Sequence, residues 1–280
     1  MQLSELRVRL REQLEGGESP ALDADVLLCH VLGRPRSFLL AWPEFEVSAQ
    51  QECELAELVR RRKRGEPVAH LTGQREFWSL MLEVSPNTLI PRPDTEVLVE
   101  SALARLPERP ARVVDLGTGT GAIALAMKSE RPFDVVLAVE FNPGAAALAR
   151  RNAARLGLAV EVREGSWLEP LTGLTFDMIV SNPPYIDAAD PHLAQGDVRF
   201  EPLSALVADD AGLADIRLIA GEAPAHLVAG GWLLVEHGWQ QGDVVQSIFI
   251  DNGFDNVATL RDYGGQERVT LGRWPGRKHA

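Results

Sequence analysis

From Arg112 to the end of the chain, short apolar runs of strand length alternate with longer segments of helical spacing. Parallel strands of one sheet need a crossover of about a dozen residues or more, usually a helix, so this alternation predicts a doubly wound α/β sheet. Residues 261–266, between the last two strands, are too few for a crossover, and we expect the final strand to run antiparallel. The predicted strands are 112–116, 134–139, 159–163, 176–181, 231–236, 256–260 and 267–272, and the predicted helices are 121–130, 143–156, 213–228 and 240–250.

The first 66 residues predict a separate helical domain. Leu3, Leu6, Leu10 and Leu14 recur at the spacing of one helix face. Residues 68–90 are more β-like, and they contain two candidate hairpin strands. These strands are 77–78 and 80–82. We therefore expect three parts, which are a helical domain at 1–66, a β-hairpin linker at 67–93 and an α/β domain at 94–280.

Charge is distributed unevenly along the chain. Residues 1–75 contain 11 Lys and Arg against 12 Asp and Glu, a net charge of −1, whereas the remaining residues contain 17 against 28, a net charge of −11. Nucleic-acid binding depends largely on basic side chains, so the acidic part is a poor match for a phosphate backbone. The one basic run, residues 60–64, predicts a solvated helix end. A contact with RNA or an acidic partner is the alternative for this run.

The sequence has no feature typical of a membrane or secreted protein. It contains no run of about 18 apolar residues, and its first residues lack an apolar signal core. Cys29 and Cys53 fall in helix-like segments, which indicates packing residues in a reducing compartment rather than a disulfide. The six histidines show no metal-ligand spacing. We therefore expect a cytoplasmic protein without a metal, and we expect it to be a monomer.

A glycine-rich turn, Gly117-Thr118-Gly119-Thr120-Gly121, follows the first predicted strand and leads into a helix. Glycines at this turn let a ligand approach the backbone closely. Glu140 ends the next strand, where a carboxylate can accept hydrogen bonds from ribose hydroxyls. The G-x-G-x-G spacing differs from the dinucleotide-binding and P-loop motifs. A ligand with a ribose but no pyrophosphate fits better, and S-adenosylmethionine is the obvious candidate.

The segment Asn182-Pro183-Pro184-Tyr185 directly follows the apolar run 176–181. Neither proline can donate a ladder hydrogen bond, so the strand ends here and its exit is stiff. Open α/β sheets bind ligands at the carboxyl ends of their strands. A carboxamide, a backbone carbonyl and an aromatic ring held there suit a planar NH2 group. We therefore predict an enzyme acting on an amide or amine nitrogen, with Asn182, Pro183 and Tyr185 as its catalytic residues.

With both motifs present, the chain resembles the HemK/PrmC family of N5-glutamine methyltransferases, which modify peptide chain release factors. The resemblance covers nearly the whole length, and the combination of segments makes it specific. The matching segments are Pro67-Val68-Ala69-His70-Leu71-Thr72-Gly73, Arg75-Glu76-Phe77-Trp78, Leu89-Ile90-Pro91-Arg92-Pro93-Asp94-Thr95-Glu96, residues 115–121, residues 181–185 and Glu236-His237-Gly238.

The resemblance implies a seven-strand, Rossmann-like methyltransferase sheet behind a helical substrate-recognition domain. The methyl donor would be S-adenosylmethionine, and the substrate would be the glutamine in the Gly-Gly-Gln motif of release factors, in support of translation termination. By family position, residues 117–121 line the methionine part of the cofactor, Glu140 holds the ribose and Trp167 lies beside the adenine. Residues 182–185 hold the substrate amide, and Asn182 also contacts the cofactor.

Two positions depart from the usual family pattern. Glu140 stands where Asp is common, and its longer side chain should still reach the ribose. Ser166 stands where an acid often precedes the tryptophan, which leaves open what binds the adenine amino group. The contact expected from Trp167 does not depend on that acid.

Two other functions compete with this interpretation. An adenine N6-methyltransferase of DNA or RNA uses a similar motif on a similar NH2 group, but it must extract its base from a stack and hold phosphates. The acidic catalytic part disfavours it. A non-catalytic cofactor-binding module, working in ribosome assembly through residues 60–64, is the second alternative. The intact segment 182–185 argues against lost catalysis.

Overall fold

The computed structural model describes residues 1–276, and the chain divides into two compact units. Unit 1 consists of Met1–Gln74 together with Ala194–Phe200. Unit 2 consists of Arg75–Leu193 and the chain from Glu201 onwards. A short segment that follows the Asn-Pro-Pro-Tyr motif in the sequence is therefore part of the helical unit.

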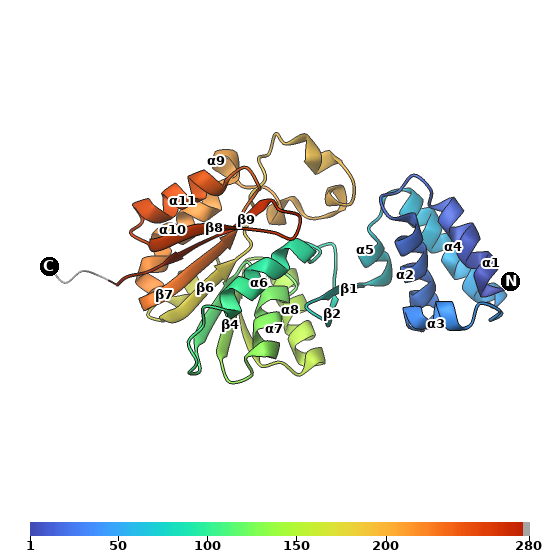
Figure 1. The fold of residues 1–280 in the computed structure, drawn as a ribbon, viewed down its shortest axis with the longest axis horizontal. Coiled ribbons are helices and arrows are strands. Elements are labelled where there is room, and N and C mark those ends of the chain that lie inside the picture. The colour runs from blue at the N-terminus through green and yellow to red at the C-terminus, as the bar shows by residue number, and fades with distance from the viewer. Residues whose placement is uncertain (277–280) are drawn as a thin grey trace. The chain divides into compact units, whose positions relative to one another are not determined.

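Unit 1 is built from helices, as predicted for the start of the chain (Figure 1). Leu3, Leu6 and Leu10 of the first helix are buried in a core that also contains Leu27 and Leu55. The fourth helix begins with a capping box, in which a serine and a glutamine satisfy each other's free backbone N–H groups. The helices are α1 (Leu3–Gln13), α2 (Pro20–Leu32), α3 (Arg36–Ala41), α4 (Ala49–Lys63) and α5 (Val68–Thr72).

The basic run 60–64 ends helix α4, and much of it is paired inside unit 1. Arg62 is the most buried of the paired side chains, with 13% of its surface exposed, and it contacts two carboxylates. This pairing supports a helix end rather than a free cationic patch. The ion pairs are Arg60 with Glu57, Arg61 with Glu66, Arg62 with Asp23 and Arg62 with Asp197.

Unit 2 contains the predicted seven-strand sheet, in the order β5-β4-β3-β6-β7-β9-β8. The strands from β5 to β7 pair in parallel. Strand β9 runs antiparallel to both β7 and β8, which confirms the expectation drawn from the short connection before it. The strands are β3 (Arg112–Leu116), β4 (Val135–Glu140), β5 (Val160–Glu164), β6 (Phe176–Ser181), β7 (Leu227–Glu236), β8 (Asp255–Arg261) and β9 (Glu267–Arg273).

Helices cover both faces of this sheet (Figure 1). Because strand side chains alternate between faces, Val113 lies in one apolar core and Val114 in the other. The first core includes residues of α6 and α7, and the second includes residues of α10 and α11. The helices of unit 2 are α6 (Glu96–Leu103), α7 (Ala122–Glu130), α8 (Pro143–Leu156), α9 (Asp209–Gly212), α10 (Ala214–His226) and α11 (Gly242–Asp251).

The hairpin of the linker differs in detail from the prediction. Its strands are β1 (Gln74–Phe77) and β2 (Leu80–Glu83). Trp78, predicted to lie in a strand, instead forms the turn with Ser79, and both have positive φ, as a two-residue hairpin turn requires. Residues 68–72 were expected to be β-like, but they form helix α5, which ends at Gly73 in the left-handed conformation.

Three 3-10 turns lie between β6 and α10, where neither a strand nor a helix was predicted before residue 213. At the end of this stretch Gly212 has a φ of +81°, and a Cβ there would lie 2.1 Å from the backbone oxygen of Tyr185. This close approach packs the turn before α10 against the Asn-Pro-Pro-Tyr motif. The 3-10 turns of the described residues are η1 (Pro93–Thr95), η2 (Glu169–Leu171), η3 (Pro191–Ala194), η4 (Val198–Phe200) and η5 (Leu203–Ala205), and η4 belongs to unit 1.

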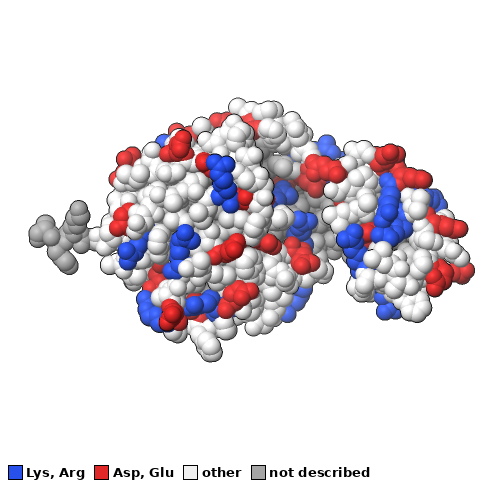
Figure 2. Space-filling view, viewed as in Figure 1, with Lys and Arg blue, Asp and Glu red and all other residues white. Residues whose placement is uncertain are grey.

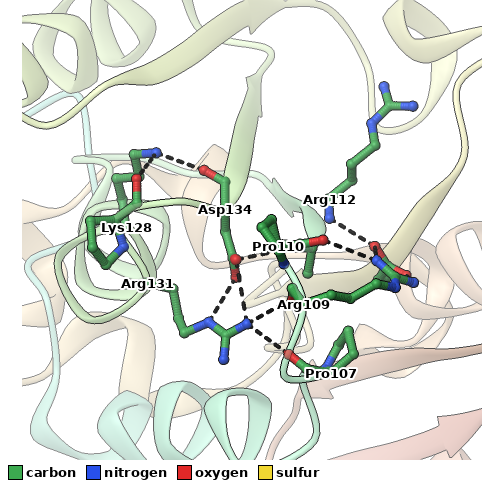
Figure 3. Close-up of polar contacts among 10 residues, drawn as sticks. Pro107, Arg109, Pro110, Arg112, Lys128, Arg131 and Asp134 are labelled. Atoms are coloured by element: carbon green, nitrogen blue, oxygen red, sulfur yellow. Dashed lines mark hydrogen bonds and ion pairs between the residues drawn. The ribbon is translucent and has the colours of Figure 1, made fainter.

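A polar network holds the loop that leads into the amino end of β3 (Figure 3). Arg131 donates to a carboxylate oxygen of Asp134 at 3.1 Å and to the backbone oxygen of Pro107 at 2.7 Å. Asp134 in turn accepts the N–H of Ala111 at 3.0 Å. These bonds tie the loop before β3 to the turn before β4, so the network has a structural role.

Three further observations concern the described residues. No helix within residues 1–276 is long and apolar enough to cross a membrane. In the same range, no group of three or more His, Cys, Asp or Glu side chains is placed to hold a metal ion. On the face of unit 2 in Figure 2, basic side chains are interspersed with acidic ones.

Candidate active site

A cavity of about 320 Å³ lies in unit 2, where β3, β4 and β6 reach their carboxyl ends. Its volume is within the range typical of small-molecule sites. Most residues predicted for the site line it, and three do not, namely Gly121, Pro183 and Tyr185. The predicted residues that line it are Gly117, Thr118, Gly119, Thr120, Glu140, Trp167, Asn182 and Pro184.

The glycine loop passes along the cavity in a conformation that L-amino acids with side chains avoid. Gly117 and Gly119 have φ values of +70° and +55°. A Cβ on Gly117 would lie 3.2 Å from the Trp167 ring, so the missing side chain makes room for the indole. Gly121 instead allows the turn into helix α7. It is the residue before the helix, and its φ of +87° lies in the left-handed region that favours glycine.

Asp115, at the end of β3, fixes the shape of this loop from inside the protein. One of its oxygens accepts the Thr118 hydroxyl at 2.5 Å and the N–H of Ala124 at 3.2 Å. The side chain is fully buried, and burial raises its pKa to about 7 against the effect of these two hydrogen bonds. Within residues 1–276 the second oxygen has no hydrogen-bond partner.

Glu140 reaches the cavity from the end of β4, as predicted. One carboxylate oxygen accepts the N–H of Gly119 at 2.8 Å, and the other accepts the N–H of Asn142 at 2.9 Å. The side chain therefore braces the glycine loop against the start of α8. Each carboxylate oxygen can accept a second hydrogen bond, so capacity remains for hydroxyl groups of a ligand.

Trp167 and Asp215 form the part of the cavity beside Gly117. Trp167 has a φ of +44°, and its indole hydrogen-bonds to the Asp215 carboxyl. Burial raises the pKa of Asp215, and the bond from Trp167 opposes that rise. Asp215 was not predicted as a site residue. It lies in the first turn of α10, and it places an acid in the cavity that Ser166 does not supply.

The Asn-Pro-Pro-Tyr motif leaves β6 at the cavity edge. Ser181 ties the strand end to β3, because its hydroxyl donates to the backbone oxygen of Leu116 at 2.8 Å. Asn182 and Pro184 line the cavity. Tyr185 points inward instead, with its hydroxyl 3.3 Å from a carboxylate oxygen of Glu236. Burial first, and Glu236 second, raise the pKa of the tyrosine hydroxyl.

Several side chains around the motif had no predicted role, although their segments contributed to the family resemblance. Thr95 and Arg92 line the cavity, and Arg92 donates to Glu201 at 2.6 Å. Glu236 is fully buried at the end of β7. Two features of the sequence could have indicated these residues. Glu236 ends a strand that neighbours β6 in the sheet, and the segment 89–96 is rich in proline and polar residues.

Comparisons with known proteins agree with this geometry. Residues 5–73 match the family model described as the PrmC N-terminal domain, and residues 93–197 match the methyltransferase small domain. A methyltransferase from Pyrococcus furiosus superposes with a TM-score of 0.55 at 19% identity, covering 82% of this chain and all of that one. The hMettl16 catalytic domain superposes with a TM-score of 0.58 at 14% identity, covering 83% and 84%. The fold and the family model together define an S-adenosylmethionine-type α/β methyltransferase.

Relatives that align over nearly the whole chain identify the family within this class of methyltransferases. The chain is 59% identical over 263 residues to the release factor glutamine methyltransferase of Escherichia coli, covering 94% of this chain and 95% of the relative. It is 55% identical over 273 residues to the enzyme of the same name from Vibrio cholerae, covering 96% of each. The Pseudomonas aeruginosa enzyme of that name is 56% identical over 263 residues. The chain belongs to the release factor glutamine methyltransferase family.

Proposed function

We propose that this methyltransferase moves a methyl group from S-adenosylmethionine to the side-chain nitrogen, N5, of the glutamine in the Gly-Gly-Gln motif of peptide chain release factors. The observation that carries the proposal is the position of Asn182. Its carboxamide borders the same cavity as the glycine loop and Glu140, so an amide held by it would lie beside a ligand held by them. Family membership supports the glutamine as the acceptor.

The residues present fit the proposed methyl donor, which supplies a methyl group on a positively charged sulfur. The backbone of Gly119, where a Cβ would meet nothing within 4 Å, leaves space for the methionine part. Glu140 retains acceptor capacity for the ribose hydroxyls. The Trp167 ring would cover the adenine, and the Asp215 carboxyl would accept its amino group in place of an acid at position 166.

The substrate amide needs activation, because its nitrogen lone pair is delocalised into the carbonyl. The side-chain oxygen of Asn182 and the backbone oxygen of Pro183 would each accept one N–H of the substrate. These two acceptors would fix the plane of the NH2 group and stabilise the positive charge that develops on nitrogen. Holding the nitrogen in line with the methyl group is then the main contribution to the rate. The Tyr185 ring, anchored through its hydroxyl to Glu236, would exclude water from the amide.

We assign the remaining tasks by region. Residues 1–66 would recognise the release factor, and residues 94–280 would catalyse the methyl transfer. Residues 67–93 would connect these two parts. A release-factor substrate would place the enzyme in the cytoplasm, where translation ends, and one copy of the chain contains every residue named for the reaction.

The test is transfer of label from S-adenosylmethionine to three acceptors offered separately, a release factor, a Gly-Gly-Gln peptide and DNA. We expect label on the release factor, and mass spectrometry should place it on the glutamine of the motif. A release factor with that glutamine replaced by glutamate is the matched control and should stay unlabelled. Label on DNA alone would overturn the proposal. Asn182→Ala should lower turnover by about 100-fold or more while cofactor affinity changes little, and unchanged turnover would remove the role of Asn182.

A further inference from the structure

Thr95 is a buried side chain of the cavity that the proposed chemistry does not use. Only 4% of its surface is exposed, and it lies at the junction of η1 and α6. Its backbone N–H donates to the oxygen of Arg92 at 3.2 Å, and two prolines in the segment 91–95 restrict the chain before it. The hydroxyl is therefore presented from a stiff backbone.

The Thr95 hydroxyl contacts the Asn182 carboxamide directly. The amide nitrogen of Asn182 donates to the Thr95 oxygen, with 3.2 Å between the two atoms. A carboxamide has its nitrogen and oxygen on opposite sides, so an amide whose nitrogen faces Thr95 directs its oxygen away from Thr95. Asn182 borders the cavity, and its oxygen is the acceptor that the substrate N–H requires.

Glu236 lies behind the contact between Thr95 and Asn182. Its carboxyl, buried at the end of β7, interacts with the hydroxyls of both Thr95 and Tyr185. An ionised carboxylate accepts hydrogen bonds and donates none. When Glu236 is ionised it can accept the hydroxyl proton of Thr95, which leaves the lone pairs of the Thr95 oxygen for Asn182. An Asn182 turned by 180° would place its own oxygen against those lone pairs.

Burial raises the pKa of Glu236 to about 7, opposed by Thr95, Arg268 and Tyr185, so the carboxyl becomes ionised only as the pH rises past that value. Arg268 is the basic group beside it and contributes to its charge balance. Arg268 is itself held at 3.2 Å by Asp262 and at 3.8 Å by Asp94. The ends of β6 and β7 are neighbours, since Ser181 pairs with Val235, so Glu236 and Asn182 follow at adjacent strand ends. The order of contacts is thus Glu236, Thr95, Asn182 and then the cavity.

We infer that Thr95 is a positioning residue for methyl transfer, which fixes the Asn182 carboxamide with its oxygen towards the acceptor amide. The inference rests on the proposed function, because it concerns the amide that Asn182 receives. Without the Thr95 oxygen, the Asn182 carboxamide loses the acceptor that orients its NH2 group. Its NH2 group can then face the NH2 group of the substrate, and two donors repel each other.

The experiment compares Thr95→Val, which keeps the shape but removes the hydroxyl, with Thr95→Ser, which restores it. We expect Thr95→Val to lower kcat for methylation of the release factor by about 10-fold or more, because small misplacements of a positioning group have effects of this size. The affinity for S-adenosylhomocysteine should stay within about twofold of the wild type. Thr95→Ser should recover most of kcat.

Two controls separate positioning from general damage. Thr270→Val makes the same change at a fully buried threonine that does not line the cavity and whose hydroxyl bonds to His237 and Thr259. It should match the stability loss of Thr95→Val without the loss of kcat. In a double-mutant cycle, Thr95→Val should have little further effect once Asn182 is replaced by Ala, since the first residue acts through the second.

Three results would overturn the inference. These are a kcat of Thr95→Val within about twofold of the wild type, equal losses in Thr95→Val and Thr95→Ser, or additive losses in the double-mutant cycle. The wild type reports on the proposed function separately. If it binds S-adenosylhomocysteine but leaves the release factor unlabelled, the proposed function fails, and with it the substrate-facing role of Asn182.

Discussion

Glu140→Gln tests most directly how this chain holds its methyl donor. The carboxylate now accepts the N–H of Gly119 at 2.8 Å and the N–H of Asn142 at 2.9 Å, one on each oxygen. A glutamine has the same length but only one oxygen. One of the two backbone N–H groups would therefore face an NH2 group and lose its acceptor. A hydrogen bond to a charged group contributes about 1.5–3 kcal/mol, and the partial exposure of Glu140 places the loss near the lower end.

Ribose hydroxyls would lose their charged acceptor in the same variant. We expect the affinity for S-adenosylhomocysteine to fall by about 10- to 100-fold, which corresponds to about 1.4–2.8 kcal/mol. Isothermal titration calorimetry measures this loss, and urea denaturation without ligand measures the stability change separately. Glu140→Asp keeps the charge but is one methylene shorter, so it cannot hold both backbone groups in place. An intermediate loss of affinity is expected for it.

Glu161→Gln is the matched control. Glu161 lies in β5 with 58% of its side chain exposed, pairs with Arg163 at 2.8 Å and does not line the cavity. The affinity of the Glu161→Gln variant for S-adenosylhomocysteine should equal that of the wild type. If Glu140→Gln also binds within about twofold of the wild type, the carboxylate does not hold the ribose. A loss of stability without a loss of affinity would reduce Glu140 to a brace for the glycine loop.

Three further predictions concern the framework of the site. Asn152→Ala removes three buried or partly buried hydrogen bonds to the backbone of β2 and the glycine loop. The free energy of unfolding in urea should therefore fall by about 3 kcal/mol. A fall of less than about 1 kcal/mol would show that these three hydrogen bonds contribute little to stability. Gly212→Ala places a Cβ 2.1 Å from the Tyr185 backbone oxygen, and thermal unfolding should show a clearly larger loss than Gly173→Ala, which has a similar φ of +78° but open space around it. Equal losses would mean that backbone strain alone matters. Burial raises the pKa of Asp115 from 3.8 to about 7, so the folded state keeps a proton that the unfolded state releases, and this group's stabilising contribution should decline by about 3 kcal/mol between pH 5 and pH 8. Asp115→Asn should remove that part of the pH dependence measured by urea denaturation, and an unchanged slope would show that the carboxyl is ionised throughout.

Much of the fold could be predicted from local patterns. The strands 112–116 and 176–181 and the helix 143–156 were predicted at the residues where the structure has them. The antiparallel last strand followed from connection length alone. Turns were predicted less well, because Trp78 in the hairpin turn and the helix at 68–72 depend on chirality and packing rather than on period.

The site was predictable to the extent that its residues follow strand ends in motifs. Gly117, Glu140 and Asn182 all border one cavity. Asp215 and Thr95 were missed, because an acid in a first helix turn and a threonine after a proline are common in structures without any site. Tyr185 was predicted to help hold the substrate amide, and that role stays a prediction, but its hydroxyl contacts Glu236 in the interior, a contact that no spacing could have indicated.

The sequence by itself determined the class of fold, the methyl donor's loop and the motif for a planar NH2 group, since each depends on residues that are close along the chain. The family followed from the combination of those segments. Only the tertiary structure decided which way the Asn182 carboxamide faces. In the structure the amide nitrogen faces Thr95, which lies 87 residues earlier in the chain. Contacts of this kind are set by how the sheet brings distant strand ends and loops together, and a local pattern does not contain that information.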